Sequence, residues 1–471
     1  MRARLVVAAF ALATVSALGI QTALVARAGF LMGDFHAFYC AAKVAAHGGD
    51  PYRSEPLHTC ETAIGPAIFF QKNPGITIPA PLPGYAIGAL VPLAWLPPAA
   101  AGALWLAILL LACAAAIVAL TRFAELPWPV PVAAFALSLG AASLPFGEIV
   151  PIAIGAICLA AYFTWQGRWV AAAVFAAIAM IEPHLGLGTC LAMFIWTPKT
   201  RLPLVVAALL LAGLSLLTLG GATNLEYFVR ILPAHALSEA ARDTQFSLTS
   251  VLASLGFADV AAVRAGSVWY LVMLVAGTLA AGWLSKKARN AAFLACVPPA
   301  FAVFGGTFVH VTQIAAALPA ALLVVSTVEP RRRTVAVIAA LLLAVPWIMA
   351  WSPALGLAPA FPIAYLAWHY WNGSLRAALV AALVSGIVIV GLNQSLSTAT
   401  PHPSHGYLGS PIDPDLAESS WSVFTSKSST GALGGWLVRI PTWGGLILLL
   451  GLIVAENGFG HLKAMRRGRV A

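Results

Sequence analysis

The sequence predicts an all-α, polytopic membrane protein with about 11–14 transmembrane helices. The chain has 471 residues, of which 61% are hydrophobic and 9% are charged, whereas a soluble globular protein has about 25% charged residues. Apolar runs of roughly 20 residues, the length that crosses a bilayer as a helix, recur along the whole chain. Segments of about ten alternating residues, which would indicate a membrane β-barrel, do not occur.

The apolar runs place the spans in order along the chain. The run at 168–196 contains Glu182-Pro183, and because a proline interrupts a helix we expect two half-helices there. The first run follows Arg2 and Arg4 and ends at Ala26-Arg27-Ala28, a pattern that also resembles a signal peptide with its cleavage site. The expected spans are 5–28, 80–97, 99–120, 129–145, 148–165, 168–196, 203–221, 263–284, 290–307, 308–327, 334–352, 359–371, 376–393 and 437–456.

Basic residues lie in short clusters between the apolar runs. Such clusters are typical of cytoplasmic loops, so we expect both termini and these loops on the cytoplasmic side of the membrane. The clusters also account for the formal charge of +10 without a nucleic-acid partner. They are Arg2 and Arg4, Lys199 and Arg201, Lys286, Lys287 and Arg289, Arg331 to Arg333, and Lys463 to Arg469.

Three long loops then fall on the outer side, at 29–79, 222–262 and 394–436. The first contains an amphipathic helix, roughly 35–47, which Gly48 and Gly49 would end by taking up a left-handed conformation. The second carries EYFVRILPAHA and QFSLTSVLASLGF, which we expect to form helices in the plane of the membrane interface.

Two cysteines, Cys40 and Cys60, share the first outer loop. In a bacterium that loop faces an oxidising compartment, so we predict a disulfide between them. No Cys or His spacing is typical of a zinc site. We therefore predict neither a metal nor a cofactor.

Asp34 lies just after the first apolar run, at the head of the helix expected at 35–47. One hypothesis makes it the N-cap, whose side chain accepts a hydrogen bond from the first turn. The other makes it a general base, whose carboxylate takes the proton from an attacking hydroxyl. The two roles are compatible, because a capping Asp can still point one oxygen outward.

Several short motifs follow one another in a recognisable order. Together they resemble the polyprenol-phosphate-dependent glycosyltransferases of the GT-C superfamily, family 87 (DUF2029), which includes mycobacterial polyprenol-phosphate-mannose-dependent mannosyltransferases. The resemblance covers roughly residues 1–330. The motifs are Gly33-Asp34-Phe35 with Tyr39, Gly49-Asp50-Pro51-Tyr52, the proline-rich 79–85, Phe146-Gly147-Glu148, Gln245-Phe246-Ser247-Leu248-Thr249-Ser250, and His310.

The resemblance implies a membrane enzyme that moves a hexose or pentose, most similar to mannose, from a polyprenyl-phosphate sugar to an envelope glycolipid or glycan. The reaction would invert the anomeric centre at the outer face of the bacterial inner membrane, with Asp34 as the base. Residues 1–330 would form the catalytic module, with outer loops 29–79 and 222–262, and residues 331–471 would add C-terminal helices with outer loop 394–436. The expected donor-phosphate and substrate contacts are His310, Arg230, Arg242, Lys43, Tyr39 and Tyr52.

Two positions depart from the family pattern. Glu148 follows Gly147 where the family commonly has Gln, and Glu182 precedes Pro183 where it commonly has a basic residue. The count of spans puts Glu148 on the inner side, so either the count is off by one span or Glu148 is structural. An alternative hypothesis is a transporter or flippase for a lipid-linked sugar, with both glutamates as intramembrane ion sites. A third is a catalytically silent scaffold of an envelope-assembly complex.

Overall fold

The protein is described by a computed structural model that covers residues 18–65, 67–240, 242, 245–347, 360–397, 412–428 and 432–455. Every regular element in this part of the chain is a helix. Five helices are long and apolar enough to cross a membrane, and seven shorter apolar helices accompany them. The all-α membrane fold predicted from the sequence is therefore confirmed.

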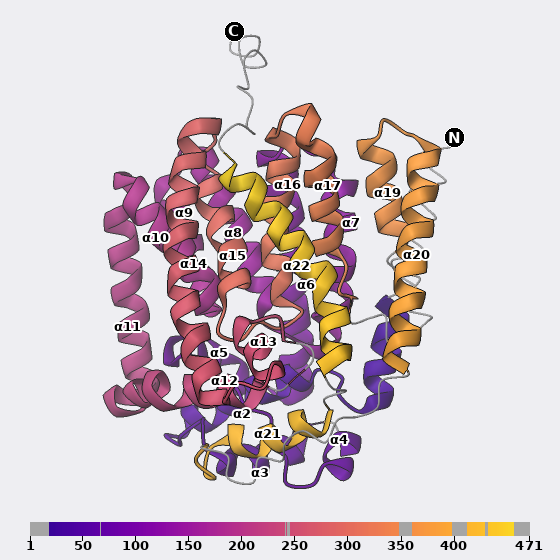
Figure 1. Cartoon of the computed structure of the whole chain (residues 1–471). Helices are drawn as coiled ribbons and strands as arrows, with labels where there is room; N and C mark the ends of the chain where they lie inside the picture. Colours follow the sequence, from indigo (N-terminus) through magenta and orange to yellow (C-terminus); the bar gives the residue numbers. More distant parts are fainter. Residues whose placement is uncertain are drawn as a thin grey trace.

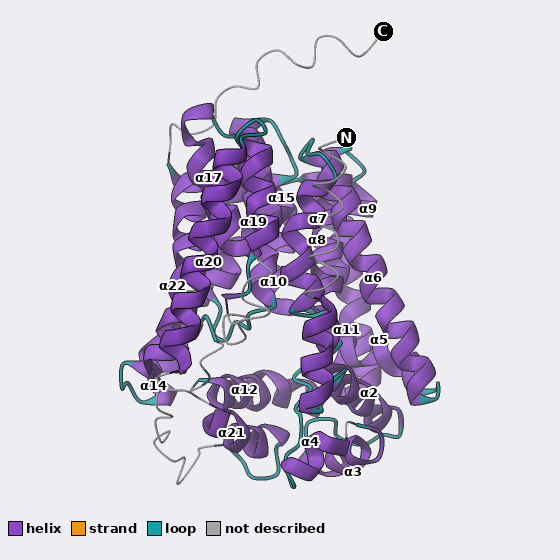
Figure 2. Cartoon of the chain, turned by 90° about the vertical axis from the view of Figure 1, so that its right-hand side faces the viewer, coloured by secondary structure: helices purple, strands orange, loops and turns teal. Residues whose placement is uncertain are grey.

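The long helices run side by side and form a bundle (Figures 1 and 2). The bundle buries one large apolar cluster, to which most of its helices contribute. Its main elements are α6 (Pro98–Phe123), α7 (Pro129–Phe135), α8 (Val150–Trp165), α9 (Trp169–Ile178), α10 (Pro183–Trp196), α11 (Pro198–Glu226), α14 (Asp259–Ala288), α15 (Phe293–Gly305), α16 (Leu318–Thr327), α17 (Pro330–Ala344), α19 (Ala360–Tyr370), α20 (Leu375–Ser397) and α22 (Ala432–Val454).

Short helices cover one end of the bundle, the lower end in Figure 1. We call these five helices the cap layer: α2 (Gly33–Ala46), α3 (Ser54–Ile64), α4 (Ala67–Lys72), α12 (Leu232–Glu239) and α21 (Ala417–Ser428). They share a second apolar cluster with the neighbouring ends of the bundle helices. The helices expected at 35–47 and in EYFVRILPAHA lie here as α2 and α12, although α2 begins two residues earlier than predicted. The helix expected in QFSLTSVLASLGF is α13 (Leu248–Ser254), which packs against α14. Gly48 is left-handed as expected, with a φ of 77°, and Gly49 is not among the left-handed residues.

The expected span at 80–97 is wrong. It contains α5 (Gly84–Ala94), a helix of 11 residues, which rises about 16 Å and is too short to cross a bilayer. Both ends of the segment contact residues of the first outer loop. The Tyr52 hydroxyl donates a hydrogen bond to the carbonyl of Leu82 at 2.7 Å, and the Tyr39 hydroxyl donates one to the carbonyl of Leu96 at 2.8 Å. The chain thus returns to the side from which it came, and the predicted side changes for the segments between this one and the half-helices at 169–196, which together also return to the side where they begin.

The half-helices predicted within 168–196 are present as α9 and α10, joined by a 3₁₀ turn at Ala179–Ile181. Glu182 breaks the helix with φ −113° and ψ 88°, and Pro183 begins α10, where its missing N–H costs no hydrogen bond. A Cβ on Gly186 would lie 2.5 Å from the carbonyl oxygen of Ala179. Only glycine therefore allows the two halves to pack so closely at the tip of this hairpin.

Basic clusters lie at the end of the bundle opposite the cap layer. Lys286 and Lys287 lie in the last turn of α14, and Arg331 to Arg333 lie in the first turn of α17. Lys199 and Arg201 lie in the first turn of α11, whose other end leads into α12 (Figure 1). The clusters thus share one side, as the sequence predicts. The clusters at Arg2 and Arg4 and at Lys463 to Arg469 lie outside the described residues, as does the start of the expected 5–28 span.

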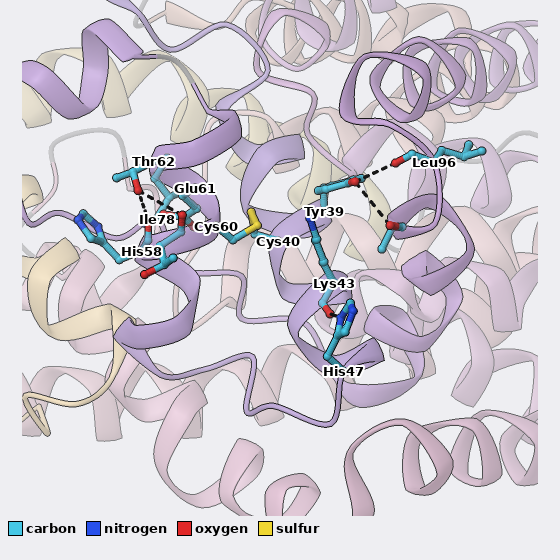
Figure 3. The surroundings of a disulfide bond; sticks show 12 residues. Tyr39, Cys40, Lys43, His47, His58, Cys60, Glu61, Thr62, Ile78 and Leu96 are labelled. Carbon is cyan, nitrogen blue, oxygen red and sulfur yellow. Dashed lines mark hydrogen bonds between the residues drawn. A yellow bond between two sulfur atoms is a disulfide. The ribbon is translucent and has the colours of Figure 1, made fainter.

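A disulfide joins Cys40 of α2 to Cys60 of α3, as the sequence predicts (Figure 3). Beside it, the buried carboxylate of Glu61 accepts a hydrogen bond from the backbone N–H of Ile78 at 3.0 Å. Burial raises the pKa of Glu61 to about 8. The bond and this contact attach α3 to the rest of the cap layer.

We expect Cys40→Ser to lower the free energy of unfolding of the cap layer by about 3 kcal/mol, because the closed loop restricts the unfolded chain. The loop spans a sequence separation of 20 residues. Limited proteolysis in detergent measures the effect, with Cys158→Ser, a buried free cysteine, as the control for a change outside the loop. Equal cleavage of Cys40→Ser and the unmodified protein within 29–79 would contradict the expectation.

Candidate active site

Asp34 lies in the first turn of α2, but it is not the N-cap. The N-cap is Met32, which is left-handed with a φ of 57°, and no side-chain cap bond forms there. The cap hypothesis for Asp34 is therefore wrong. The side chain is half-buried. Burial raises the pKa of Asp34 to about 7, the positive charge of Arg242 opposes this, and the negative charge of Glu239 adds to it.

The segment around Glu148 packs directly against the start of α2. The N–H of Met32 donates to the carbonyl of Pro145 at 2.8 Å. A Cβ on Gly147 would lie 2.7 Å from the Cβ of Phe35, and Gly147 itself is left-handed with a φ of 71°. Glu148 thus lies on the side of Asp34, whose charge adds to the effect of burial and raises the pKa of Glu148. The expectation that Glu148 faces the inner side is wrong, because α5 does not cross the membrane.

A second group of residues is centred on Glu239 at the end of α12. Its side chain is 1% exposed. One carboxylate oxygen accepts a hydrogen bond from the indole N–H of Trp421 at 2.6 Å, and the other accepts from the side-chain amide of Gln245 at 2.9 Å. The guanidinium of Arg242 lies 3.3 Å from the carboxylate. Three donors and a positive charge therefore hold Glu239 as an ionised acceptor.

His235 lies one helical turn before Glu239 on the same face of α12, and His310 comes from the loop after α15. The three side chains offer atoms that all lie within 4.8 Å of one another. Imidazole nitrogens and carboxylate oxygens are ligands that zinc accepts. However, Trp421, Gln245 and Arg242 already contact Glu239, and Gln245 also contacts the Nδ1 of His310 at 3.0 Å. The absence of a metal, expected from the sequence, stays a prediction.

The tip of the 169–196 hairpin reaches the same place. His184 lies 3.4 Å from the carboxylate of Glu182. The ring of His184 contacts the ring of Phe308 at a centroid distance of 5.7 Å. The ring of His235 contacts the same Phe308 ring at 4.8 Å. Phe308 thus links the hairpin tip, which carries Glu182, to α12, which carries Glu239.

Four buried polar atoms in this region form no hydrogen bond of ordinary geometry among the described residues, although Thr312 lies near enough to Glu148 to lower its pKa. Buried polar groups in native proteins are nearly always hydrogen-bonded, so each such atom needs an explanation. Their gathering in one region indicates a place for a polar ligand. The atoms are Oε2 of Glu148, Nε2 of His184, Nδ1 of His235 and Oγ1 of Thr312.

The C-terminal helices contribute to this site. Arg439 of α22 is 1% exposed. Its Nε donates to the carbonyl of Gln245 at 2.6 Å, and its Nη2 donates to the carbonyl of Arg242 at 3.2 Å and to the hydroxyl of Ser250. One buried guanidinium thus fixes the segment that carries Arg242 and Gln245. The division of the chain at residue 330 stays a prediction, but residues beyond it hold the site together.

The other residues expected at the site have different surroundings. Arg230 pairs with Glu226 at 2.8 Å and with Asp413. Lys43 lies in the last turn of α2, about 13 Å of helix rise from Asp34. The hydroxyls of Tyr39 and Tyr52 hold the ends of the 80–97 segment. The structure therefore brings only Arg242 and His310 of these candidates into the group around Asp34 and Glu239.

Sequence reasoning missed four residues of this group: His235, Glu239, Trp421 and Arg439. The spacing of His235 and Glu239, four residues apart on a predicted interfacial helix, is a signal that could have identified them. Trp421 and Arg439 gave no such signal, because their partners are 182 and 194 residues away in the sequence.

Residues 83–304 match the family model for glycosyltransferase family 87. The matched range includes Glu148, the hairpin tip and the segment from α12 to Gln245, whereas Asp34, His310 and Arg439 lie outside it. No curated protein and no solved structure matches the chain.

Proposed function

We propose that this chain, of which residues 83–304 match the model of glycosyltransferase family 87 and which has helices long enough to cross a membrane, is a multi-pass membrane glycosyltransferase whose donor is a polyprenyl-phosphate sugar. The sugar transferred is a hexose or pentose, with mannose favoured. The acceptor is a glycolipid or glycan of the bacterial envelope, and the reaction takes place at the cap-layer end of the bundle.

The observation that supports this proposal best is the position of Asp34. Its half-buried carboxylate lies among the charges of Arg242, Glu239 and Glu148, next to buried polar atoms that form no hydrogen bond of ordinary geometry among the described residues. Burial and acidic neighbours give a carboxylate a pKa near the working pH, which suits a general base. The other acids of the site lie beside it, so an acceptor hydroxyl bound there would be within the same group of residues.

In the proposed reaction, Asp34 takes the proton of the acceptor hydroxyl as its oxygen attacks the anomeric carbon. The new C–O bond forms on the face opposite the lipid phosphate. The bond from the anomeric carbon to the phosphate oxygen breaks, and its electrons leave with the polyprenyl phosphate. One displacement therefore inverts the anomeric centre. Arg242 and His310 donate to the phosphate oxygens, on which negative charge develops.

The positions of the basic clusters support the outer face as the place of reaction. They lie at the end of the bundle opposite the cap layer, and such clusters mark the cytoplasmic side. The cap layer then faces the periplasm of the inner membrane. A disulfide within this layer agrees with an oxidising compartment.

The transporter hypothesis gains no separate support. Glu148, one of its two ion sites, lies beside Asp34 at the cap-layer end, and Glu182 is near enough for its charge to act on Glu148. Both glutamates thus belong to the site already described and do not form a path across the bundle.

A transfer assay tests the proposed function. Purified protein is mixed with polyprenyl-phosphate sugars of different head groups and with envelope lipid extracts, and the products are analysed by mass spectrometry. We expect one sugar to give an acceptor with the mass of one added hexose or pentose residue. Nucleotide sugars serve as the donor control. Transfer from a nucleotide sugar and none from the lipid-linked sugars would contradict the proposal.

We expect the rate of transfer to fall below about pH 7. Asp34 acts in its deprotonated form, and its pKa of about 7 means that the protonated, inactive form gains population as the pH decreases. Arg242 lowers this pKa, and Glu239 raises it. The measurement is kcat/KM between pH 5 and 9, with a loss of about tenfold per pH unit on the acid side. A rate that is flat from pH 5 to 7 would contradict this role of Asp34.

A further inference from the structure

Gln245 connects two loops of the site that are far apart in the sequence. It forms an antiparallel β-bridge with His310, and the N–H of the next residue, Phe246, donates to the carbonyl of Val309 at 2.9 Å. Its side chain is 1% exposed. The side-chain oxygen accepts from the N–H of Val309 at 2.7 Å, and the side-chain nitrogen contacts both Glu239 at 2.9 Å and the Nδ1 of His310 at 3.0 Å.

Two of these contacts fix which end of the Gln245 amide is which. A backbone N–H can only donate, so the amide oxygen must face Val309. An ionised carboxylate can only accept, so the amide nitrogen must face Glu239. Glu239 is held in the ionised form by Arg242 and Trp421. The opposite orientation would put two donors against each other at Val309 and two acceptors against each other at Glu239, so the assignment does not depend on His310.

The fixed amide leaves one role for His310. The amide nitrogen carries two hydrogens, and one of them goes to Glu239. The other points at the Nδ1 of His310, which must therefore present its lone pair. An imidazole with a lone pair on Nδ1 carries its hydrogen on Nε2. No described residue accepts a hydrogen bond from that Nε2, and the side chain of His310 is half-buried.

We propose that Gln245 is a positioning residue that holds His310 as a neutral imidazole with its N–H at Nε2, directed at an oxygen of the donor phosphate. The inference rests on the proposed function, because it assigns the phosphate as the acceptor of this hydrogen bond. In the other tautomer, Nε2 would present a lone pair to a negatively charged oxygen and repel it. Arg439 and the indole of Trp443 support the arrangement, since Trp443 donates to the carbonyl of Phe246 at 3.1 Å.

The first test reads the tautomer directly and needs no substrate. The protein is labelled with ¹⁵N-histidine, reconstituted in nanodiscs and studied by NMR, and the His310 signals are identified as those missing in His310→Gln. We expect a protonated Nε2 and an unprotonated Nδ1. In Gln245→Glu the carboxylate accepts from Nδ1, so the neutral ring carries its proton on Nδ1 instead of Nε2 and presents a lone pair at Nε2. Gln166→Glu, at an exposed glutamine at the end of α8, is the matched control and leaves the His310 signals unchanged.

The second test measures transfer. Gln245→Glu is expected to lower kcat by about 10²-fold, as when one donor to the developing negative charge is lost. His310→Gln places an amide N–H near the position of Nε2 and is expected to retain more transfer than His310→Asn, whose shorter amide cannot reach it. The thermal unfolding of each variant in detergent shows whether it folds.

The outcomes separate the inference from the proposed function. A protonated Nδ1 in the unmodified protein overturns the inference, whatever the activity. Coordination of added Zn²⁺ by Nε2 of His310, seen as a shift of that signal, also overturns it. A tautomer that changes in Gln245→Glu while transfer stays the same overturns the positioning role. A protein with the expected tautomer that transfers no lipid-linked sugar instead refutes the proposed function.

Discussion

Asp34→Asn is expected to reduce the rate of sugar transfer by about 10²–10⁴-fold, the usual effect of losing a general base. The amide has nearly the same shape as the carboxylate but does not take a proton from the acceptor hydroxyl. No cap bond is lost, because the N-cap of α2 is Met32 and no side-chain bond forms there. The folded structure should therefore persist, and the measurement is the transfer rate beside the melting temperature in detergent.

Asp34→Ala distinguishes catalysis from capping more sharply. A capping Asp replaced by Ala would cost about 1 kcal/mol, whereas the structure predicts a melting temperature close to that of the unmodified protein. Asp415→Asn repeats the Asp34→Asn change at an exposed carboxyl next to α21. It is the control for that variant and should keep full activity. If Asp34→Asn keeps most of its activity, the base is another acid, and Glu148 beside it is the first to test.

Glu239→Ala is expected to lower the free energy of unfolding by about 3 kcal/mol, the low end of the cost of breaking a buried ion pair from one side, because the side chain of Arg242 is 30% exposed. The change leaves the guanidinium of Arg242 without its carboxylate, and it removes the acceptor for Trp421 and Gln245. Because these three partners come from different elements, the cap layer should separate from the bundle first. The measurement is chemical unfolding in detergent, followed by tryptophan fluorescence.

Two further variants show whether the loss of stability in Glu239→Ala comes from the ion pair with Arg242. Asp415→Ala removes an exposed carboxyl from the same layer and should unfold like the unmodified protein. Glu239→Gln keeps an oxygen that accepts from Trp421 but loses the charge opposite Arg242, so its loss should be smaller than that of Glu239→Ala. If Glu239→Ala unfolds at the same denaturant concentration as Asp415→Ala, Glu239 does not hold the cap layer in place.

The sequence predicted the elements whose signals are local. Apolar runs identified most of the bundle helices, because a bilayer requires about 20 apolar residues wherever the neighbours lie. Glu182-Pro183 predicted the break between α9 and α10, since proline lacks the N–H that a helix interior uses, whichever residues lie around it. Cys40 and Cys60 predicted their disulfide, because both lie in one short outer loop.

The failed predictions for 80–97 and for Glu148 depended on contacts between distant segments, and the one for Asp34 on the local backbone. The 80–97 run is as apolar as a span, and only the hydrogen bonds of Tyr52 to Leu82 and of Tyr39 to Leu96 show that it returns to the cap layer. Glu148 was predicted on the inner side because the 80–97 segment had been counted as a membrane span. Asp34 had the residue type of an N-cap, but the left-handed backbone of Met32 begins the helix one position before Gly33.

The sequence by itself determined that this protein is a helical membrane protein, and it predicted a catalytic site with Asp34, Arg242 and His310. Composition, apolar run length and short motifs carry that information, and none of them needs the position of a partner. Only the tertiary structure decided which residues surround these three. Trp421 donates to Glu239 across 182 residues of chain, and Arg439 donates to the carbonyl of Gln245 across 194 residues. Buried polar groups find such partners in space, not along the sequence.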